Sequence, residues 1–183
     1  RGSEMCIRDR NKSQYINKNQ KVNDQFIADS GYGQGQILMN PLQLASIYSA
    51  FVNNGSIYRP HLVEQGEQMW IQRVFSDKTV KTIKEDLINV IADEKGTGHA
   101  IYRDNVILAG KTGTAEIKQS QSDTTGTELG WFTVMTTDSK QPLLITTMVE
   151  DVKDRGGSGY VVEHTKTPLD LYPVSYTHLR AHE

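Results

Sequence analysis

The sequence contains a single cysteine, Cys6, among its 183 residues. One thiol forms no disulfide framework within the chain and gives no cysteine cluster for a metal ion. No apolar stretch approaches the roughly 20 residues that a membrane-spanning helix needs. Lysine and arginine number 20 against 22 acidic residues, without basic runs, so the formal net charge is −2. The composition therefore gives no support to nucleic-acid binding and is typical of a globular domain.

The two ends of the chain show neither helical nor strand periodicity. Residues 1–10 read RGSEMCIRDR, and residues 173–183 read PVSYTHLRAHE. Both strings look like translated sequencing-adaptor read-through, and foreign segments of this kind are set aside before fold reasoning. We therefore expect residues 11–172 to be the native part, a fragment of a longer reading frame. Native disordered termini are the alternative interpretation.

The first part of the native stretch is predicted to hold a long loop and one helix. Residues 11–30 are polar and favour a loop with at most a short turn. The three glycines within 31–35 indicate unusual dihedral angles or a close backbone approach. Asn40-Pro41 is typical of a helix start, and we expect the helix to cover 42–52. Apolar residues lie almost all round this helix, which predicts burial on most sides.

The middle of the chain predicts two short extended segments, at 57–63 and 69–74, and then a second helix. Ser76 or Asp77 can cap this helix, which runs to about residue 93 and ends before Gly96-Thr97-Gly98. Five of its apolar residues share one face at the spacing of an amphipathic helix, namely Val80, Ile83, Leu87, Val90 and Ile91.

Three strand-like runs follow, at 106–117, 129–137 and 142–152, each bounded by polar or glycine-rich turns. The short connection between the last two predicts antiparallel neighbours. The polar segment 118–127 is long for a hairpin loop, and we hypothesise that it gates access to a cleft. A last helix is predicted over 160–172, where Pro168 indicates either a kink or an early end. The order of elements indicates an α+β fold with an antiparallel sheet.

The strongest candidate for chemistry is Lys111-Thr112-Gly113, in the first of these three strands. Taken alone, the tripeptide is weak evidence, because an exposed lysine on a strand is the ordinary interpretation. Its context is more specific, because Thr114 follows it directly, Gly96-Thr97-Gly98 lies upstream and Gly130-Trp131-Phe132 begins the next strand.

Three spans of sequence together resemble the transpeptidase domain of class B penicillin-binding proteins. They are GYGQGQILMNPLQLASIYSAFVNNG, GTGHAIYRDNVILAGKTGTAEIK and LGWFTV, and the resemblance covers about residues 12 to 172. It is greatest for the low-affinity branch that underlies β-lactam resistance. The resemblance implies the penicillin-binding and serine β-lactamase-like fold, an antiparallel sheet flanked by helices. We expect the fold to be incomplete on its N-terminal side and the isolated piece to be marginally stable.

The resemblance also implies roles for individual residues, since the family's site combines Ser-x-x-Lys, Ser-x-Asn and Lys-Thr/Ser-Gly. Lys111 and the Thr112 hydroxyl would bind the substrate carboxylate, and Gly113 would leave room for the substrate. The Thr114 hydroxyl would join them, while the Thr114 backbone N–H would form half of the oxyanion hole. Gln34 either lines the cleft or merely sets the entry into the helix that follows it.

Two of the three motifs are absent from this sequence. No serine has lysine three positions on, and none has asparagine two positions on. The chain as given therefore lacks a nucleophile and its base, which truncation explains better than divergence. The resemblance implies that the parent is a membrane-anchored, extracytoplasmic D,D-transpeptidase that acts on peptidoglycan stem peptides ending in D-Ala-D-Ala and binds β-lactams, with no cofactor or metal. A β-lactam sensor domain, a serine β-lactamase and a non-catalytic domain are the alternatives.

Other polar and aromatic residues are weaker candidates. We expect the scattered histidines His61, His99 and His164 to be solvated or satisfied rather than ligands. Trp131 and Phe132 favour core packing at a strand start. The acidic residues that follow the third strand favour a solvated turn, and they are Glu150, Asp151 and Asp154.

Overall fold

The computed structural model describes residues 13–16, 21–35, 37–62, 66–117, 125–138, 140 and 142–172. The two end segments predicted to be artefacts lie outside these residues, as does most of the predicted gating loop at 118–127. The chain divides into two compact units, residues 1–44 and 45–183, and each is described by itself. The predicted α+β class with an antiparallel sheet is confirmed.

The unit of residues 1–44 contains a helix, α2 (Asp24–Gly31), where the sequence predicted a loop. The Phe26 amide donates to Asn23 Oδ1 at 2.8 Å, so Asn23 caps the helix. Phe26 is buried, and its ring meets the Tyr15 ring edge-on with centroids 5.0 Å apart. The loop prediction was wrong because one cap and one buried aromatic fix two turns of helix without a long apolar stripe.

Helix α3 (Pro41–Ser49) begins where the sequence predicted and ends three residues early. Asn40 Oδ1 accepts from the Leu42 amide at 2.9 Å, which confirms the predicted start. The chain then turns back, and the Gly55 amide donates to Ala50 O at 2.8 Å with Gly55 at φ +76°. The prediction of burial on most sides is wrong, because Ser46 is the one buried residue of α3.

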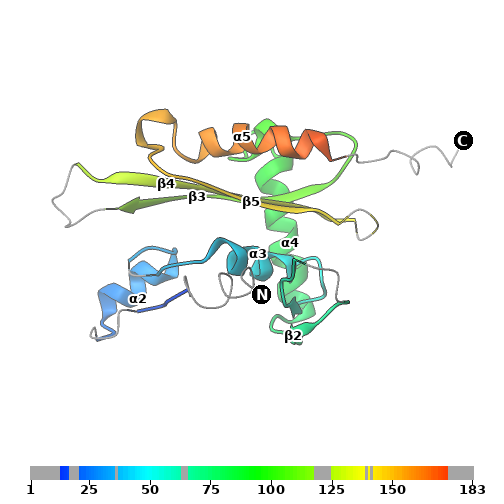
Figure 1. Ribbon diagram of the computed structural model, residues 1–183, viewed down its shortest axis with the longest axis horizontal. Helices are drawn as coiled ribbons and strands as arrows, with labels where there is room; N and C mark the ends of the chain where they lie inside the picture. The colour runs from blue at the N-terminus through cyan, green and yellow to red at the C-terminus, as the bar shows by residue number, and fades with distance from the viewer. Residues whose placement is uncertain are drawn as a thin grey trace, which may run out of the picture. The chain divides into compact units, whose positions relative to one another are not determined.

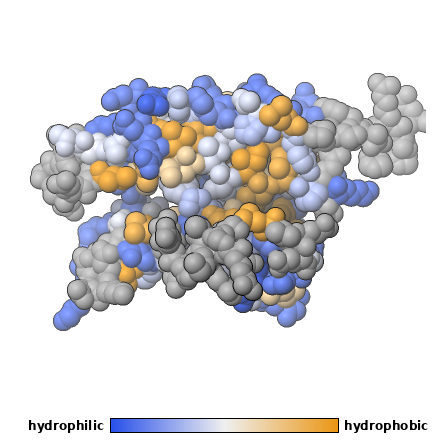
Figure 2. All heavy atoms as spheres, viewed as in Figure 1, coloured by the Kyte–Doolittle hydropathy of each residue, from blue (hydrophilic) through white to orange (hydrophobic). Residues whose placement is uncertain are grey.

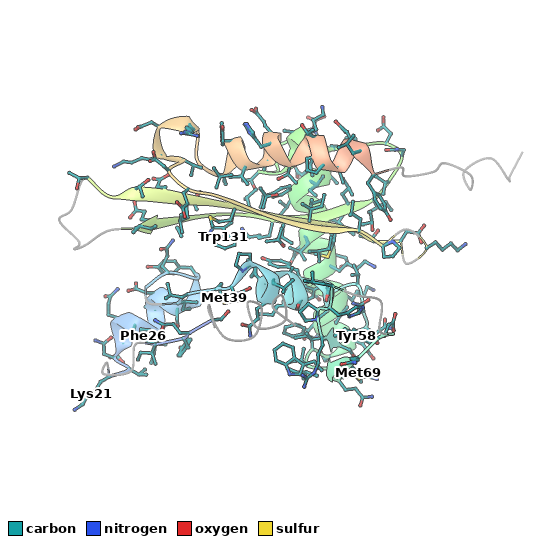
Figure 3. The ribbon with its side chains drawn as sticks, viewed as in Figure 1. Lys21, Phe26, Met39, Tyr58, Met69 and Trp131 are labelled. Atoms are coloured by element: carbon teal, nitrogen blue, oxygen red, sulfur yellow. The ribbon has the colours of Figure 1, made fainter. Side chains whose placement is uncertain are left out.

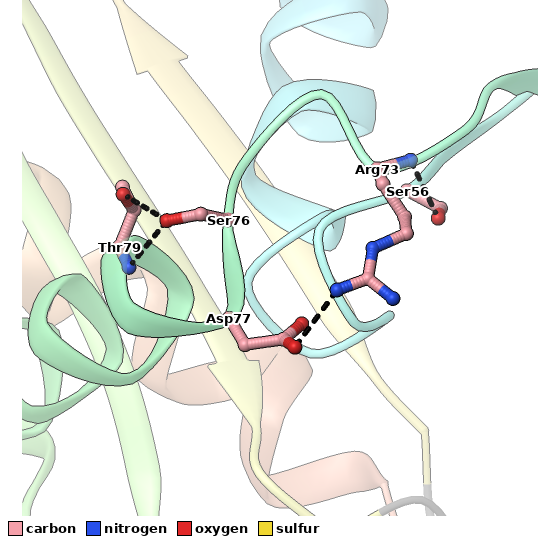
Figure 4. Close-up of polar contacts among 5 residues, drawn as sticks. All are labelled: Ser56, Arg73, Ser76, Asp77 and Thr79. Atoms are coloured by element: carbon pink, nitrogen blue, oxygen red, sulfur yellow. Dashed lines mark hydrogen bonds and ion pairs between the residues drawn. The ribbon is translucent and has the colours of Figure 1, made fainter.

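A small antiparallel pair, β1 (Ile57–Tyr58) with β2 (Met69–Ile71), leads into helix α4 (Asp77–Ala92). Figure 4 shows the start of α4, where Ser76 Oγ accepts from the Thr79 amide at 3.2 Å. Arg73 and Asp77 form an ion pair of 2.8 Å beside this cap. The predicted amphipathic helix is confirmed to within one residue of its end.

The main sheet has the order β3-β4-β5, formed by β3 (Leu108–Ile117), β4 (Thr127–Thr136) and β5 (Leu144–Val149). Both pairings are antiparallel, and β3 and β4 stay in register from Leu108↔Thr136 to Ile117↔Thr127. A short 3₁₀ turn, η1 (His99–Ile101), precedes β3, and a second, η2 (Lys153–Arg155), follows β5. Helix α5 (Ser158–Leu171) completes the fold and contains Pro168.

Helix α5 covers one face of the sheet, as Figure 1 shows. The outward side of α5 is mostly hydrophilic in Figure 2, while its inward side joins the main core. That core comprises Ile91, Ile101, Leu108, Phe132, Val134, Val152, Val161, Val162 and Leu169. A second cluster, made of Phe51, Leu87, Ala109 and Met135, lies on the opposite face of the sheet. Helix α4 therefore contributes to both cores, through Ile91 and Leu87.

A buried hydroxyl also fixes α5 on the sheet. Thr165 is fully buried, and its Oγ1 lies 2.9 Å from Thr147 Oγ1 on β5 and 2.8 Å from Val161 O. Arg103, just after η1, pairs with Asp170 near the helix end. Because the buried hydroxyl is satisfied, it orients the helix without a desolvation penalty.

Replacing Gly110 by alanine is expected to destabilise the protein by about 1–3 kcal/mol, the usual cost of overpacking. A Cβ at this position would lie 2.8 Å from Thr133 O and 2.9 Å from Ile91 Cδ1, so α4 and β3 would have to separate. Urea unfolding followed by circular dichroism measures the change. Gly159→Ala is the matched control, because a Cβ there meets nothing within 4 Å. Equal stability of the two variants would contradict this packing.

Candidate functional site

The Lys111 strand is an outer strand of the described sheet. Successive side chains of a strand point to opposite faces, so Lys111 and Gly113 share one face and Thr112 and Thr114 share the other. Thr112 lies opposite Phe132, a residue of the main core, and therefore faces the α5 side. Figure 3 shows Trp131, the partner of Gly113, on the face away from α5.

Lys111 is exposed, and its ammonium group stays beside the motif. Lys111 Nζ donates to the backbone oxygen of Thr112 at 2.7 Å. This contact uses one of the three protons that an ammonium group can donate. The geometry therefore keeps a positive charge next to the Lys-Thr-Gly backbone while leaving donor capacity for an anion.

Thr112 is only 7% exposed, and its hydroxyl oxygen lies 2.7 Å from the hydroxyl oxygen of Thr97. Either oxygen can be the donor. Sequence analysis used Gly96-Thr97-Gly98 as the end of a helix and as context for the motif, but it did not predict this contact. The one sequence signal for this contact is a threonine between two glycines upstream of the motif.

The loop that carries Thr97 is seated on the C-terminal end of α4. The Gly98 amide donates to Val90 O at 3.0 Å, and His99 Nδ1 lies 2.9 Å from Ile91 O. A Cβ on Gly96 would come within 2.3 Å of Val90 O, so this backbone approach requires glycine. The turn thus presents the Thr97 hydroxyl from a defined position.

Unlike position 96, position 113 does not require glycine for packing among the described residues. A Cβ at Gly113 would meet only Trp131 Cβ, at an ordinary contact distance of 3.6 Å, and the residue does not have positive φ. Within the described residues, then, neither packing nor backbone conformation explains the absence of a side chain. A glycine at this position leaves the strand open to close approach by another molecule.

Thr114 lies beside the turn that leads into α5. It is exposed and pairs with Gly130 in the sheet, and its Oγ1 would be 3.7 Å from a Cβ on Gly157. Gly157, at φ +62°, occupies a backbone conformation that glycine favours. The Thr112 and Thr114 hydroxyls therefore belong to one face of the strand, two residues apart.

Gln34 belongs to the other compact unit, that of residues 1–44. Its backbone amide donates to Asp29 O at 2.9 Å, between Gly33 and Gly35, which both have positive φ. The interpretation that this loop sets the entry into the helix that follows it stays a prediction. A role for Gln34 in lining a cleft stays a prediction.

The remaining sequence candidates have local partners. His61, His99 and His164 each place Nδ1 within 3.2 Å of a backbone oxygen. Phe132 is fully buried, as predicted, whereas Trp131 is half-buried. Among the described residues no group of three histidine, cysteine or acidic side chains is placed to hold a metal ion, and no helix combines the length and apolar character of a membrane span.

A protein-family model described as "Penicillin binding protein transpeptidase domain" matches residues 2–167. The chain belongs to this family. It is 42% identical over 146 residues to "Penicillin-binding protein 3" of Bacillus subtilis (strain 168), a match that covers 78% of this chain and 22% of the relative. It is 27% identical over 163 residues to "Peptidoglycan D,D-transpeptidase MrdA" of Haemophilus influenzae, over 78% of this chain and 25% of the relative.

The fold of this transpeptidase-family chain is also found among solved structures. Penicillin-binding protein A from M. tuberculosis, solved as an acyl-enzyme complex, has a TM-score of 0.68 at 18% identity, over 87% of this chain and 38% of that chain. The predicted transpeptidase-type fold is thereby confirmed. The chain spans about a quarter or less of the length of the two curated relatives, with shares of 22% and 25%.

Gly113→Ala is expected to leave the free energy of unfolding unchanged, or to raise it by up to about 1 kcal/mol, because alanine loses less backbone entropy than glycine on folding. Urea unfolding of the variant beside the native protein measures this. Gly110→Ala is the contrasting variant on the same strand. A loss of stability as large as that of Gly110→Ala would show that Gly113 serves internal packing instead.

Proposed function

We propose that this chain is the Lys-Thr-Gly part of a peptidoglycan D,D-transpeptidase, a penicillin-binding enzyme that cross-links stem peptides through a serine acyl-enzyme. The observation that carries the proposal is the arrangement on β3. One exposed ammonium group, two hydroxyl groups and a glycine without an internal role lie on four consecutive residues of an outer strand. Membership in the transpeptidase family supplies the reaction class.

The ligand chemistry matches these groups. A stem peptide ending in D-Ala-D-Ala carries a terminal carboxylate, and a penicillin carries one at the corresponding place. Lys111 and the hydroxyls of Thr112 and Thr114 would bind this carboxylate through charge-assisted hydrogen bonds. Gly113 would let the extended ligand lie close to the strand.

The catalytic serine is proposed to come from a part of the parent protein outside this sequence, because no Ser-x-x-Lys occurs within it. Its Oγ would add to the carbonyl carbon of the penultimate D-alanine, and its proton would pass to a base. The tetrahedral intermediate's oxyanion would be held partly by the Thr114 N–H. Collapse would release D-alanine with a proton, and the amine of a neighbouring stem peptide would then take the acyl group and free the serine.

The parent protein is further proposed to belong to the low-affinity, resistance-type class B branch. Its substrate requires that it work at the extracytoplasmic face of the plasma membrane, held there by an anchor outside this sequence. The sequence spans that resemble this branch support the assignment. Slow acylation by penicillins relative to a sensitive class B enzyme is the property that would define it.

Lys111→Met in the full-length protein is expected to slow acylation by fluorescent penicillin by about tenfold to a hundredfold, the loss of one hydrogen bond to a charged group. The labelled acyl-enzyme is measured on denaturing gels over time. Lys81→Met is the matched control, because Lys81 is an exposed lysine on α4.

Two results would contradict the proposed function. One is absence of any covalent penicillin adduct on the full-length native protein. The other is equal acylation of Lys111→Met and Lys81→Met. Steady turnover of the antibiotic by the native protein would favour a β-lactamase over a transpeptidase.

A further inference from the structure

We propose that Thr97 is a positioning residue of the transpeptidase site, which fixes the Thr112 hydroxyl as a donor to the substrate carboxylate. This inference rests on the proposed function, since it concerns the same ligand. It adds a residue outside the Lys-Thr-Gly motif and assigns it a specific task. The observation that carries it is the 2.7 Å contact between the two hydroxyl oxygens.

The direction of the hydroxyl protons follows from the chemistry of the ligand. A threonine hydroxyl has one proton to donate, and an ionised carboxylate only accepts hydrogen bonds. If Thr112 donates its one proton to the carboxylate, it cannot donate to Thr97. The short contact can persist only if Thr97 then donates to Thr112. The bound state therefore contains a directed chain from the Thr97 hydroxyl through the Thr112 hydroxyl to the carboxylate.

Burial makes the direction matter at Thr112. Because Thr112 is only 7% exposed, it has little access to water that could replace a lost partner. The proton that Thr97 donates also polarises the Thr112 hydroxyl, which strengthens its own hydrogen bond to the anion. Thr97 itself is exposed, so its remaining hydrogen-bonding capacity can be met by solvent.

Backbone contacts of the protein itself hold Thr97 in position. Its turn is held by the Gly98 amide on Val90 O and by the close approach of Gly96 to the same oxygen. The contact therefore joins the turn after α4 to the motif strand. A preorganised donor of this kind avoids the cost of ordering the hydroxyl during binding.

If Thr97 had only a structural role, its loss would affect ligands with and without a carboxylate equally. The two roles differ in one measurable respect, because a positioning role acts only on ligands that carry the anion. A penicillin and its methyl ester share the reactive ring and differ in this group. Their acylation rates on the same variant therefore separate the two roles.

The experiment measures the second-order acylation rate of the full-length protein by benzylpenicillin and by its methyl ester. Thr97→Val removes the hydroxyl at nearly constant shape and is expected to slow benzylpenicillin by about threefold to tenfold, the effect of one neutral hydrogen bond. Its ester rate is expected to stay within about twofold of native. Thr97→Ser keeps the hydroxyl and is expected to restore the benzylpenicillin rate.

Thr146→Val is the matched control, because Thr146 Oγ1 contacts Thr133 Oγ1 at 3.1 Å in a second hydroxyl pair of the same sheet. It is expected to change neither rate. Equal slowing of acid and ester by Thr97→Val, no slowing of either, or failure of Thr97→Ser to restore the rate would overturn the inference.

Failure of the proposed function gives a separate result, since the native protein would then form no adduct with either compound. The inference is judged in that case by equilibrium binding of acetyl-D-Ala-D-Ala and its C-terminal amide to the full-length protein. Thr97→Val must weaken binding of the acid and leave binding of the amide unchanged. The same loss for both peptides, or for neither, would overturn it.

Discussion

The register between β3 and β4 is the constraint on which the rest of this structure depends. Ten consecutive pairs join the two strands, and β4 also pairs with β5. Alternate side chains of β4 enter both cores, with Phe132 on the α5 side and Met135 on the other. A slip of one residue would turn the side chains of one strand to the opposite faces of the sheet, so that either Phe132 and Met135 or Lys111 and Thr112 would exchange faces. The cores and the functional strand are therefore specified by the same pairing.

Two glycines of this strand illustrate how stability and function divide along it. Gly110 is required inside the protein, because α4 and β4 leave no room for a Cβ. A Cβ at Gly113, three residues further on, would meet only Trp131, at an ordinary contact distance. The strand thus passes from a segment that packing restricts to glycine to a segment where an added Cβ meets no close contact among the described residues. The Thr97–Thr112 contact lies at this transition and joins the turn after α4 to the Lys-Thr-Gly motif.

Much of the fold could be predicted from the sequence, because the elements with long periodic patterns form as expected. The amphipathic helix α4 and the three strands are examples, with differences of a few residues at their ends. Helix α2 was missed because its stability depends on one Asn23 cap and one buried ring. The extent of α3 was overestimated because the turn closed by Gly55 ends it early.

The candidate site likewise contains residues that could be predicted from the sequence and a residue that could not. Lys111 to Thr114 could be found from a contiguous motif, and its placement on a strand was predicted correctly. Thr97 could not be found, because its partner lies 15 residues away and the contact depends on how a turn is seated on α4. No periodicity records a contact of this kind. The separate roles of Gly110 and Gly113 likewise required the positions of neighbouring atoms.

The crystal structure of the full-length protein acylated by a penicillin tests the central claim most directly. The claim predicts that the ligand carboxylate lies within about 3.2 Å of the hydroxyl oxygens of Thr112 and Thr114, with the Lys111 ammonium group lining the same pocket. It also predicts that the Thr97–Thr112 contact persists in the adduct. A carboxylate bound away from β3, with both threonine hydroxyls lacking contact to the ligand, would contradict the claim.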